Sequence, residues 1–138
     1  MQKDDTQKLI DYSVDFATKM LTDNQEFFPF AVTVNLKGDL ITTGYFDGDD
    51  QPLSQDLINK LQPLLDRLLD NKERRAYALT YDVRVQKDNS SEKTDAIAVK
   101  VKHTDTKNIT VYYFAYKLTS QKIIEHLDSW AQTDKREQ

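Results

Sequence analysis

The chain has no cysteine and only three glycines and three prolines among its 138 residues. Without cysteine there is no disulfide framework, no thiolate nucleophile and no cysteine-based zinc site. So few glycines argue against a phosphate-binding glycine loop. The N-terminus is polar where a signal peptide would be apolar, and no apolar run reaches membrane-spanning length. We therefore expect a cytoplasmic protein without a membrane partner.

A strongly basic stretch is also missing. The chain has 19 Lys and Arg against 23 Asp and Glu, a net charge of −4, and its densest basic run, residues 72–75, still contains a glutamate. Nucleic-acid binding needs clustered cations, so we expect no nucleic-acid partner. With 38% hydrophobic and 30% charged residues, the composition is typical of one globular domain over residues 1–138, with 133–138 as a frayed tail.

Apolar residues at helical spacing predict two helices in the N-terminal half. Residues 6–21 have one apolar face, and residues 53–69 have a leucine stripe that Pro63 interrupts. The proline costs about 3 kcal/mol, whereas each buried Leu or Ile contributes about 1.5–3 kcal/mol, so we expect a kinked helix and not a broken one.

Between these helices the sequence predicts a β-hairpin. Residues 27–34 are apolar on both faces, which indicates a strand covered on both sides, and residues 40–46 return after a turn that contains Gly38. The expected cross-strand pairs are Val34–Leu40, Val32–Thr42, Phe30–Gly44 and Phe28–Phe46. A phenylalanine ring over Gly44 would cover the bare glycine backbone.

The C-terminal half alternates polar and apolar residues over segments 76–85, 94–103 and 109–117, which predicts three strands. Thr119 and Ser120 suit a helix cap, and Ile123, Leu127, Trp130 and Ala131 have helical spacing, which predicts a third helix.

These elements predict an α+β fold with three helices and a five-stranded antiparallel sheet, in the order α-β-β-α-β-β-β-α. By element order the chain resembles profilin-like or roadblock-like folds. That resemblance implies the sheet order 2-1-5-4-3, with strand 27–34 inside the sheet beside the fifth strand.

The segments Phe27-Phe28-Pro29-Phe30-Ala31-Val32 and Glu92-Lys93-Thr94-Asp95-Ala96-Ile97-Ala98-Val99 are similar to a set of small uncharacterised bacterial proteins with the same helix-hairpin-helix-meander plan. The resemblance covers most of the chain and implies a bacterial cytoplasmic setting. It brings no activity, catalytic residue or cofactor to this sequence.

One sheet face is the predicted interaction surface. We expect Leu79 to share a face with Ile97, Val99 and Val101, and a second face to combine polar residues with an alanine-rich patch. Tyr and Arg are favoured at interface hot spots. The candidate binding residues on this second face are Asp82, Arg84, Lys100, Tyr112 and Tyr116. Either helices cover most of this face and leave the polar residues at its rim, or the face is open to a partner or a small ligand.

The sequence predicts no catalytic residue, metal ligand or cofactor. His103 and His126 have no visible partner set, and we expect both on the surface. The acidic loop 47–50 lacks the later ligands of a calcium loop. Asp82 and Asp95 are expected on opposite faces, which argues against a carboxylate pair.

A non-catalytic protein-binding module, such as a bacterial regulatory or immunity-type inhibitor, is therefore our leading hypothesis, with another protein as partner and a homodimer as a further option. The alternative is a small-molecule binder, or an enzyme with an unrecognised pocket between the sheet and its helices. A purely structural subunit is a third possibility.

Overall fold

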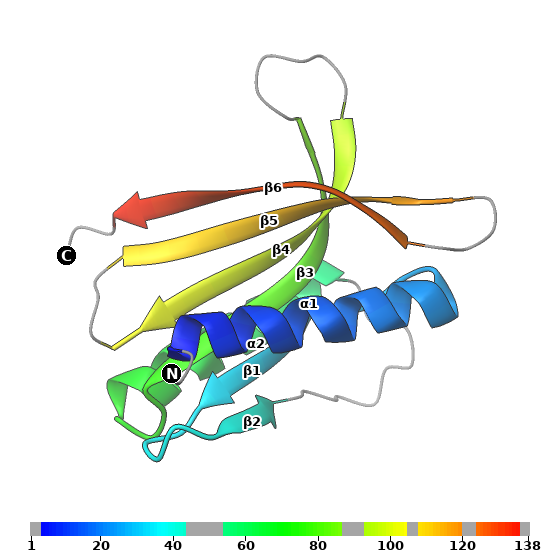
Figure 1. Cartoon of the computed structure of the whole chain (residues 1–138). Helices are drawn as coiled ribbons and strands as arrows, with labels where there is room; N and C mark the ends of the chain where they lie inside the picture. Colours follow the sequence, from blue (N-terminus) through cyan, green and yellow to red (C-terminus); the bar gives the residue numbers. More distant parts are fainter. Residues whose placement is uncertain (1–3, 44–53, 87–92, 105–107, 120–123, 136–138) are drawn as a thin grey trace.

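The computed structural model describes residues 4–43, 54–86, 93–104, 108–119 and 124–135. These residues form two helices and an antiparallel sheet, whose long, twisted strands are visible in Figure 1. In chain order the elements are α1 (Asp5–Asn24), β1 (Phe30–Val34), β2 (Leu40–Thr43), α2 (Ser54–Asp70), β3 (Ala76–Gln86), β4 (Lys93–His103), β5 (Asn108–Leu118) and β6 (Ile124–Lys135).

The six strands form one sheet in the order β2-β1-β3-β4-β5-β6, with every neighbouring pair antiparallel. The α+β class is confirmed. The predicted count of five strands and three helices is wrong, and so is the profilin-like order 2-1-5-4-3. Strand β1 lies inside the sheet as expected, but its second neighbour is β3 and not β5. Helix α2 connects β2 to β3, which pairs with the side of β1 opposite β2. Strands β4, β5 and β6 then follow in chain order.

The predicted hairpin is present. Val34 pairs with Leu40 and Val32 with Thr42, as expected. In the turn, the Asn35 side chain accepts hydrogen bonds of 2.9 Å from the backbone N–H groups of Lys37 and Asp39, and Gly38 adopts a φ of 93°. The predicted pairs Phe30–Gly44 and Phe28–Phe46 lie outside the described residues.

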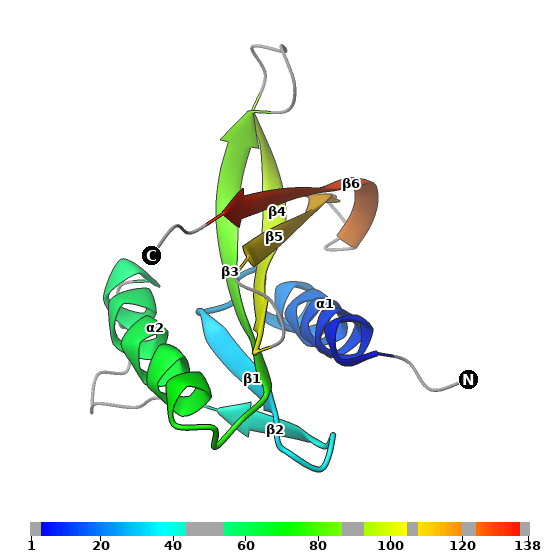
Figure 2. The same cartoon turned by 90° about the vertical axis from the view of Figure 1, so that its left-hand side faces the viewer.

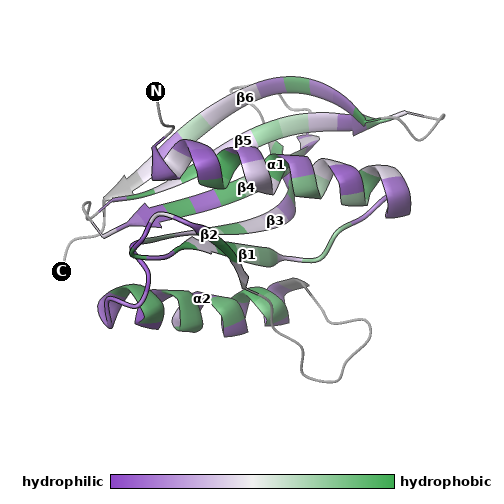
Figure 3. Ribbon diagram, turned by 60° about the horizontal axis from the view of Figure 1, so that its bottom comes forward, coloured by the Kyte–Doolittle hydropathy of each residue, from purple (hydrophilic) through white to green (hydrophobic). Residues whose placement is uncertain are grey.

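The two helices cover opposite faces of the sheet (Figure 2). We call these faces the α1 face, which includes Val32, Ala78 and Val99, and the α2 face, which includes Ala31 and Leu79. Figure 3 shows the strongly apolar strand β1 between the two helices. Its coverage on both sides explains why both of its faces are apolar.

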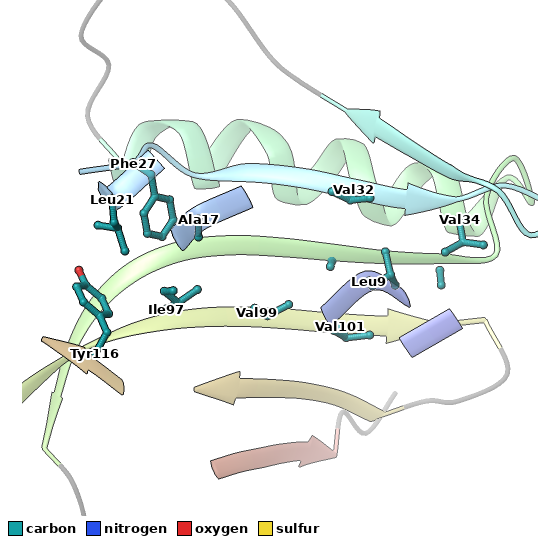
Figure 4. Packing of buried hydrophobic residues seen from close by; sticks show 12 residues of the cluster. Leu9, Ala17, Leu21, Phe27, Val32, Val34, Ile97, Val99, Val101 and Tyr116 are labelled. Atoms are coloured by element: carbon teal, nitrogen blue, oxygen red, sulfur yellow. The ribbon is translucent and has the colours of Figure 1, made fainter. Parts of the chain in front are cut away.

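Helix α1 begins at an Asp4 cap, whose side chain accepts a 2.8 Å hydrogen bond from the Gln7 N–H, and ends at Gln25 in the left-handed conformation. Its buried residues recur at four-residue steps and include Leu9, Ala17 and Leu21. These side chains pack on valines and Ile97 of the sheet (Figure 4). Each buried leucine stabilises the fold by about 1.5–3 kcal/mol before entropy, which fixes α1 on this face.

Helix α2 continues through Pro63, so the expectation of an unbroken helix is confirmed. Its buried leucines, Leu57, Leu61, Leu65 and Leu69, also recur at four-residue steps. Three of them, Leu61, Leu65 and Leu69, pack with Ala31, Tyr77 and Leu79 in a second core.

The predicted C-terminal helix is wrong, because residues 124–135 form strand β6. This strand pairs with β5 from Leu118–Ile124 to Asn108–Lys135, and the register shifts between Phe114 and Tyr116. The irregularity breaks the two-residue alternation of a strand, which leaves Leu127 and Trp130 at a spacing that also suits a helix. The strand includes residues 133–135 of the expected frayed tail, and residues 136–138 lie outside the described part of the chain.

The register of β3 against β4 also differs from the prediction. Asp82 pairs with Ile97 and Thr80 with Val99, and directly paired residues share a face. Ile97 and Val99 therefore lie on the α1 face with Asp82, whereas we expected them with Leu79. A shift by one residue exchanges all faces of a strand, and the β3–β4 loop length allowed either register.

Candidate functional site

Four of the five predicted binding residues lie on the α1 face. Arg84 pairs with Asp95, Asp95 pairs with Tyr116, and Val99 pairs with Tyr112, so the cross-strand register carries one face through β3, β4 and β5. Lys100 pairs with Leu79 and Val111 and therefore lies on the α2 face. The prediction that Lys100 shares a face with the other four residues is wrong.

Asp95 joins this surface, although we expected it on the face opposite Asp82. Its pairing with Arg84 places Asp95 on the α1 face, diagonally next to Asp82. We call the group Asp82, Arg84, Asp95, Tyr112 and Tyr116 the Asp82 surface. It combines two carboxylates, a guanidinium and two phenols.

The strand pattern explains where the Asp82 surface begins. Ala78 and Thr80 of β3 are fully buried under α1, whereas Asp82 and Arg84, the next two residues on the same face, are exposed. Small residues let the helix approach the sheet, and charged residues follow where its coverage ends. The surface therefore starts at the boundary of the α1 core.

Tyr116 spans this boundary. It is only 5% exposed, it belongs to the α1 core with Leu21 and Phe27 (Figure 4), and its hydroxyl donates a 2.9 Å hydrogen bond to Asp82 Oδ1. A tyrosine with an apolar ring in the core and a polar tip outside needs such a partner. The contact fixes the orientation of the Asp82 carboxylate.

The carboxylate and the phenol alter each other's ionisation. Burial raises the pKa of Asp82, with a further increase from the charge of Asp95, while the hydrogen bond from Tyr116 opposes the rise. Burial and the negative charge of Asp82 raise the pKa of Tyr116 far above its ordinary value. Tyr116 therefore stays protonated at neutral pH and remains a hydrogen-bond donor. Because Asp82 is exposed, the surrounding solvent limits how far its pKa rises.

His126 extends this region onto β6. It pairs with Tyr116, is exposed as predicted, and its Nε2 lies 3.5 Å from Thr18 Oγ1 of α1. We expected it on a helix, whereas it lies on a strand at the edge of the α1 face.

His103 is not the exposed histidine that we predicted. Its Nε2 lies 2.9 Å from Asp5 Oδ2, and Arg75 donates two further hydrogen bonds of 2.7 and 2.8 Å to the same carboxylate. The hydrogen bonds from Arg75 lower the pKa of Asp5, and His103 contributes to the decrease, although burial opposes it. The cluster connects the start of α1 to Arg75, directly before β3, and to the last residue of β4. No local sequence pattern links three residues so far apart in the chain, so sequence reasoning missed it.

An aromatic cluster on the α1 side was also missed as a surface. Phe16 contacts Phe30 edge-on at 4.8 Å between ring centroids and stacks with Tyr12 at 6.1 Å. Phe16 is 38% exposed and Phe28 is 40% exposed. The density of phenylalanine in residues 27–30 was a signal, but pairing within the hairpin suggested a purely structural role.

The described residues contain no group of three or more His, Asp or Glu side chains that could hold a metal ion. The acidic loop 47–50 lies outside them. In the same part of the chain, no helix combines the length and the apolar character needed to cross a membrane.

Comparison of the chain with protein-family models, with curated proteins and with solved structures gives no match.

Proposed function

We propose that this protein is a non-catalytic protein-binding module that contacts its partner through the Asp82 surface. The observation that carries the proposal is the hydrogen bond between Tyr116 and Asp82, which holds a carboxylate in a fixed orientation at the end of the α1 core. A side chain that is already ordered loses little entropy on binding.

The composition of the surface supports a protein partner. Tyrosine and arginine are enriched at interface hot spots, and both types occur here beside two carboxylates. Arg84 and Asp95 are exposed and available to charged groups of a partner. The resemblance to small uncharacterised bacterial proteins favours a bacterial cytoplasmic setting, in which such a module would act as a regulatory or immunity-type inhibitor. The alternative, a ligand pocket between sheet and helices, gains no support, since the described residues there pack into two apolar cores.

Affinity capture with charge-reversed variants tests the proposal. The wild-type chain, Arg84→Glu and Lys100→Glu are immobilised, and proteins retained from a lysate of the source cells are quantified by mass spectrometry. Lys100→Glu is a matched control, because it makes the same change of charge on the α2 face. We expect a protein that the wild type and Lys100→Glu retain and that Arg84→Glu retains about tenfold less, as for the loss of one hot-spot residue.

Tyr116→Phe provides a second, milder variant. It keeps the ring in the core and removes only the hydrogen bond to Asp82. We expect the Tyr116→Phe variant to retain less of the same protein. Its thermal unfolding curve should match that of the wild type. Equal losses in Arg84→Glu and Lys100→Glu, or no specifically retained protein, would contradict the proposal.

A further inference from the structure

Strand β6 forms one edge of the sheet. It is 12 residues long and, among the described strands, pairs only with β5. The opposite edge, β2, has only 4 residues. An edge strand presents backbone N–H and C=O groups along its outer side, and a longer edge offers more of them to an added strand. The structure therefore has one edge that is long enough to bind an extended segment.

Both faces of β6 are also accessible. Residues 125–129 and 131–133 are exposed, and Leu127 is 49% exposed, although leucine favours burial. Two residues of β6 are packed: Ile124 lies against the α1 core, and the ring of Trp130 stacks on Tyr113 at 5.4 Å between centroids. A strand added beside β6 would therefore find side-chain contacts on both faces as well as backbone partners.

The charge of β6 selects the kind of partner. Its sequence contains Glu125, Asp128 and Asp134 against Lys135, in a chain of net charge −4. A second copy of β6 would pair two strands that both carry a net negative charge. An extended segment with Lys or Arg would meet a complementary strand.

Strand β6 is continuous with the Asp82 surface. His126 pairs with Tyr116, and Ala131 pairs with Tyr112. In an added strand, alternate side chains would therefore project on the same side as these two tyrosines. A partner bound at the edge would extend onto the surface described above.

We infer that β6 binds an extended, basic segment of the partner protein by strand addition. Backbone hydrogen bonds to the outer edge supply affinity, Lys or Arg side chains next to Glu125 and Asp128 supply specificity, and an apolar side chain covers Leu127. This inference rests on the proposed protein-binding function and specifies the partner's chemistry.

Selection from a phage-displayed library of random peptides, each as long as β6, tests the inference. The bait is the full chain. We expect the selected peptides to alternate apolar and polar residues, to be rich in Lys and Arg, and to slow hydrogen exchange of the β6 amides when added as synthetic peptides. The double variant Glu125→Lys/Asp128→Lys should bind these peptides about tenfold more weakly.

The control is the double variant Asp56→Lys/Asp70→Lys, which has the same net charge but changes exposed residues of α2. It should bind the selected peptides nearly as well as the wild type. Failure to select peptides, peptides without a basic preference, equal weakening in both double variants, or dimerisation of the chain through β6 would overturn the inference. A captured protein that depends on Arg84 but not on Glu125 and Asp128 would overturn strand addition while the protein-binding function stands.

Discussion

Two buried threonines differ in whether their hydroxyls have hydrogen-bond partners. Thr33 and Thr80 are both fully buried on central strands. The Thr33 hydroxyl donates to the Ile41 carbonyl at 3.3 Å and accepts from Arg74 Nε at 3.0 Å, whereas the Thr80 hydroxyl has no hydrogen-bond partner among the described residues. A buried polar group without a partner costs about 1–3 kcal/mol.

Thr80→Val should therefore raise the free energy of unfolding by about 1 kcal/mol, because valine keeps the shape and removes the unsatisfied hydroxyl. Thr33→Val, the matched control, should lower it by about 1–2 kcal/mol, because it breaks two contacts and leaves the Arg74 donor without this acceptor. Urea denaturation of both variants measures the difference. Destabilisation by Thr80→Val would show that its hydroxyl has a partner in solution.

The contributions of Asp5 and Asp82 to folding stability should change with pH in opposite directions. Arg75 lowers the pKa of Asp5 in the folded protein, so its contribution to stability is present above its unfolded pKa and is lost as the pH falls through the folded pKa. Burial raises the pKa of Asp82, so its charge opposes folding at neutral pH and ceases to do so as the pH falls through its folded pKa.

Asp5→Asn should therefore reduce stability at pH 7, and its deficit should shrink as the pH falls below about 4. Asp82→Asn should be slightly more stable than the wild type at pH 7, and this gain should vanish at acidic pH, where residue 82 is uncharged in both proteins. Denaturation midpoints measured from pH 7 to pH 3 compare the variants. Parallel pH profiles for the two variants would contradict the assigned environments.

At the scale of an element, Pro63 is the main irregularity of α2. It lies inside the helix and is exposed, so nothing in the core requires it. Pro63→Ala restores a backbone donor and removes a ring clash, and the gain of about 3 kcal/mol is partly offset by about 1 kcal/mol of extra unfolded-chain entropy. We expect a net stabilisation of about 1–2 kcal/mol in thermal or urea unfolding. The control Arg67→Ala, on the same helix, should change stability by less than about 0.5 kcal/mol.

The elements that sequence predicts correctly are those with strong periodicity. Both N-terminal helices, the hairpin register at Val32–Thr42 and strands β3 to β5 follow from apolar spacing alone. Strand β6 does not, because an edge strand exposed on both faces has no need for strict alternation, and its irregular register interrupts what alternation it has.

The candidate site was predicted in its residue types but not in its geometry. Tyr116, Asp82 and Arg84 were found from alternation within single strands. The position of Lys100 and Asp95 depends on the β3–β4 register, which is fixed by the packing of Ile97 and Val99 under α1. Such long-range packing cannot be predicted from the local sequence. A shift of the β3–β4 register by one residue moves every side chain of β4 to the opposite face.

Across the whole molecule, the strands that form the buried cores differ from the strand that is exposed to solvent. Strands β1, β3 and β4 carry most of the buried residues of both cores, whereas β6 is exposed on both faces. Helix α1 covers the middle of its face, and the Asp82 surface and β6 lie beyond that cover. The surfaces proposed for binding therefore lie mostly outside the two cores, and Tyr116 is the residue that joins the Asp82 surface to the α1 core.

This separation predicts a gradient of hydrogen-exchange protection. Amides of β1, β3 and β4 should exchange only through global unfolding, because their strands are paired on both sides and packed under helices. Amides of β6 should exchange faster than those of β3 and β4, through local opening, because β6 pairs only with β5 among the described strands and few of its side chains are buried. Native-state exchange measured by NMR in increasing urea distinguishes the two routes: β6 rates should depend weakly on urea and β3 rates strongly.

Equal protection and equal urea dependence in β6 and β3 would mean that β6 opens only with the core, and that its edge is more firmly held than its exposure indicates.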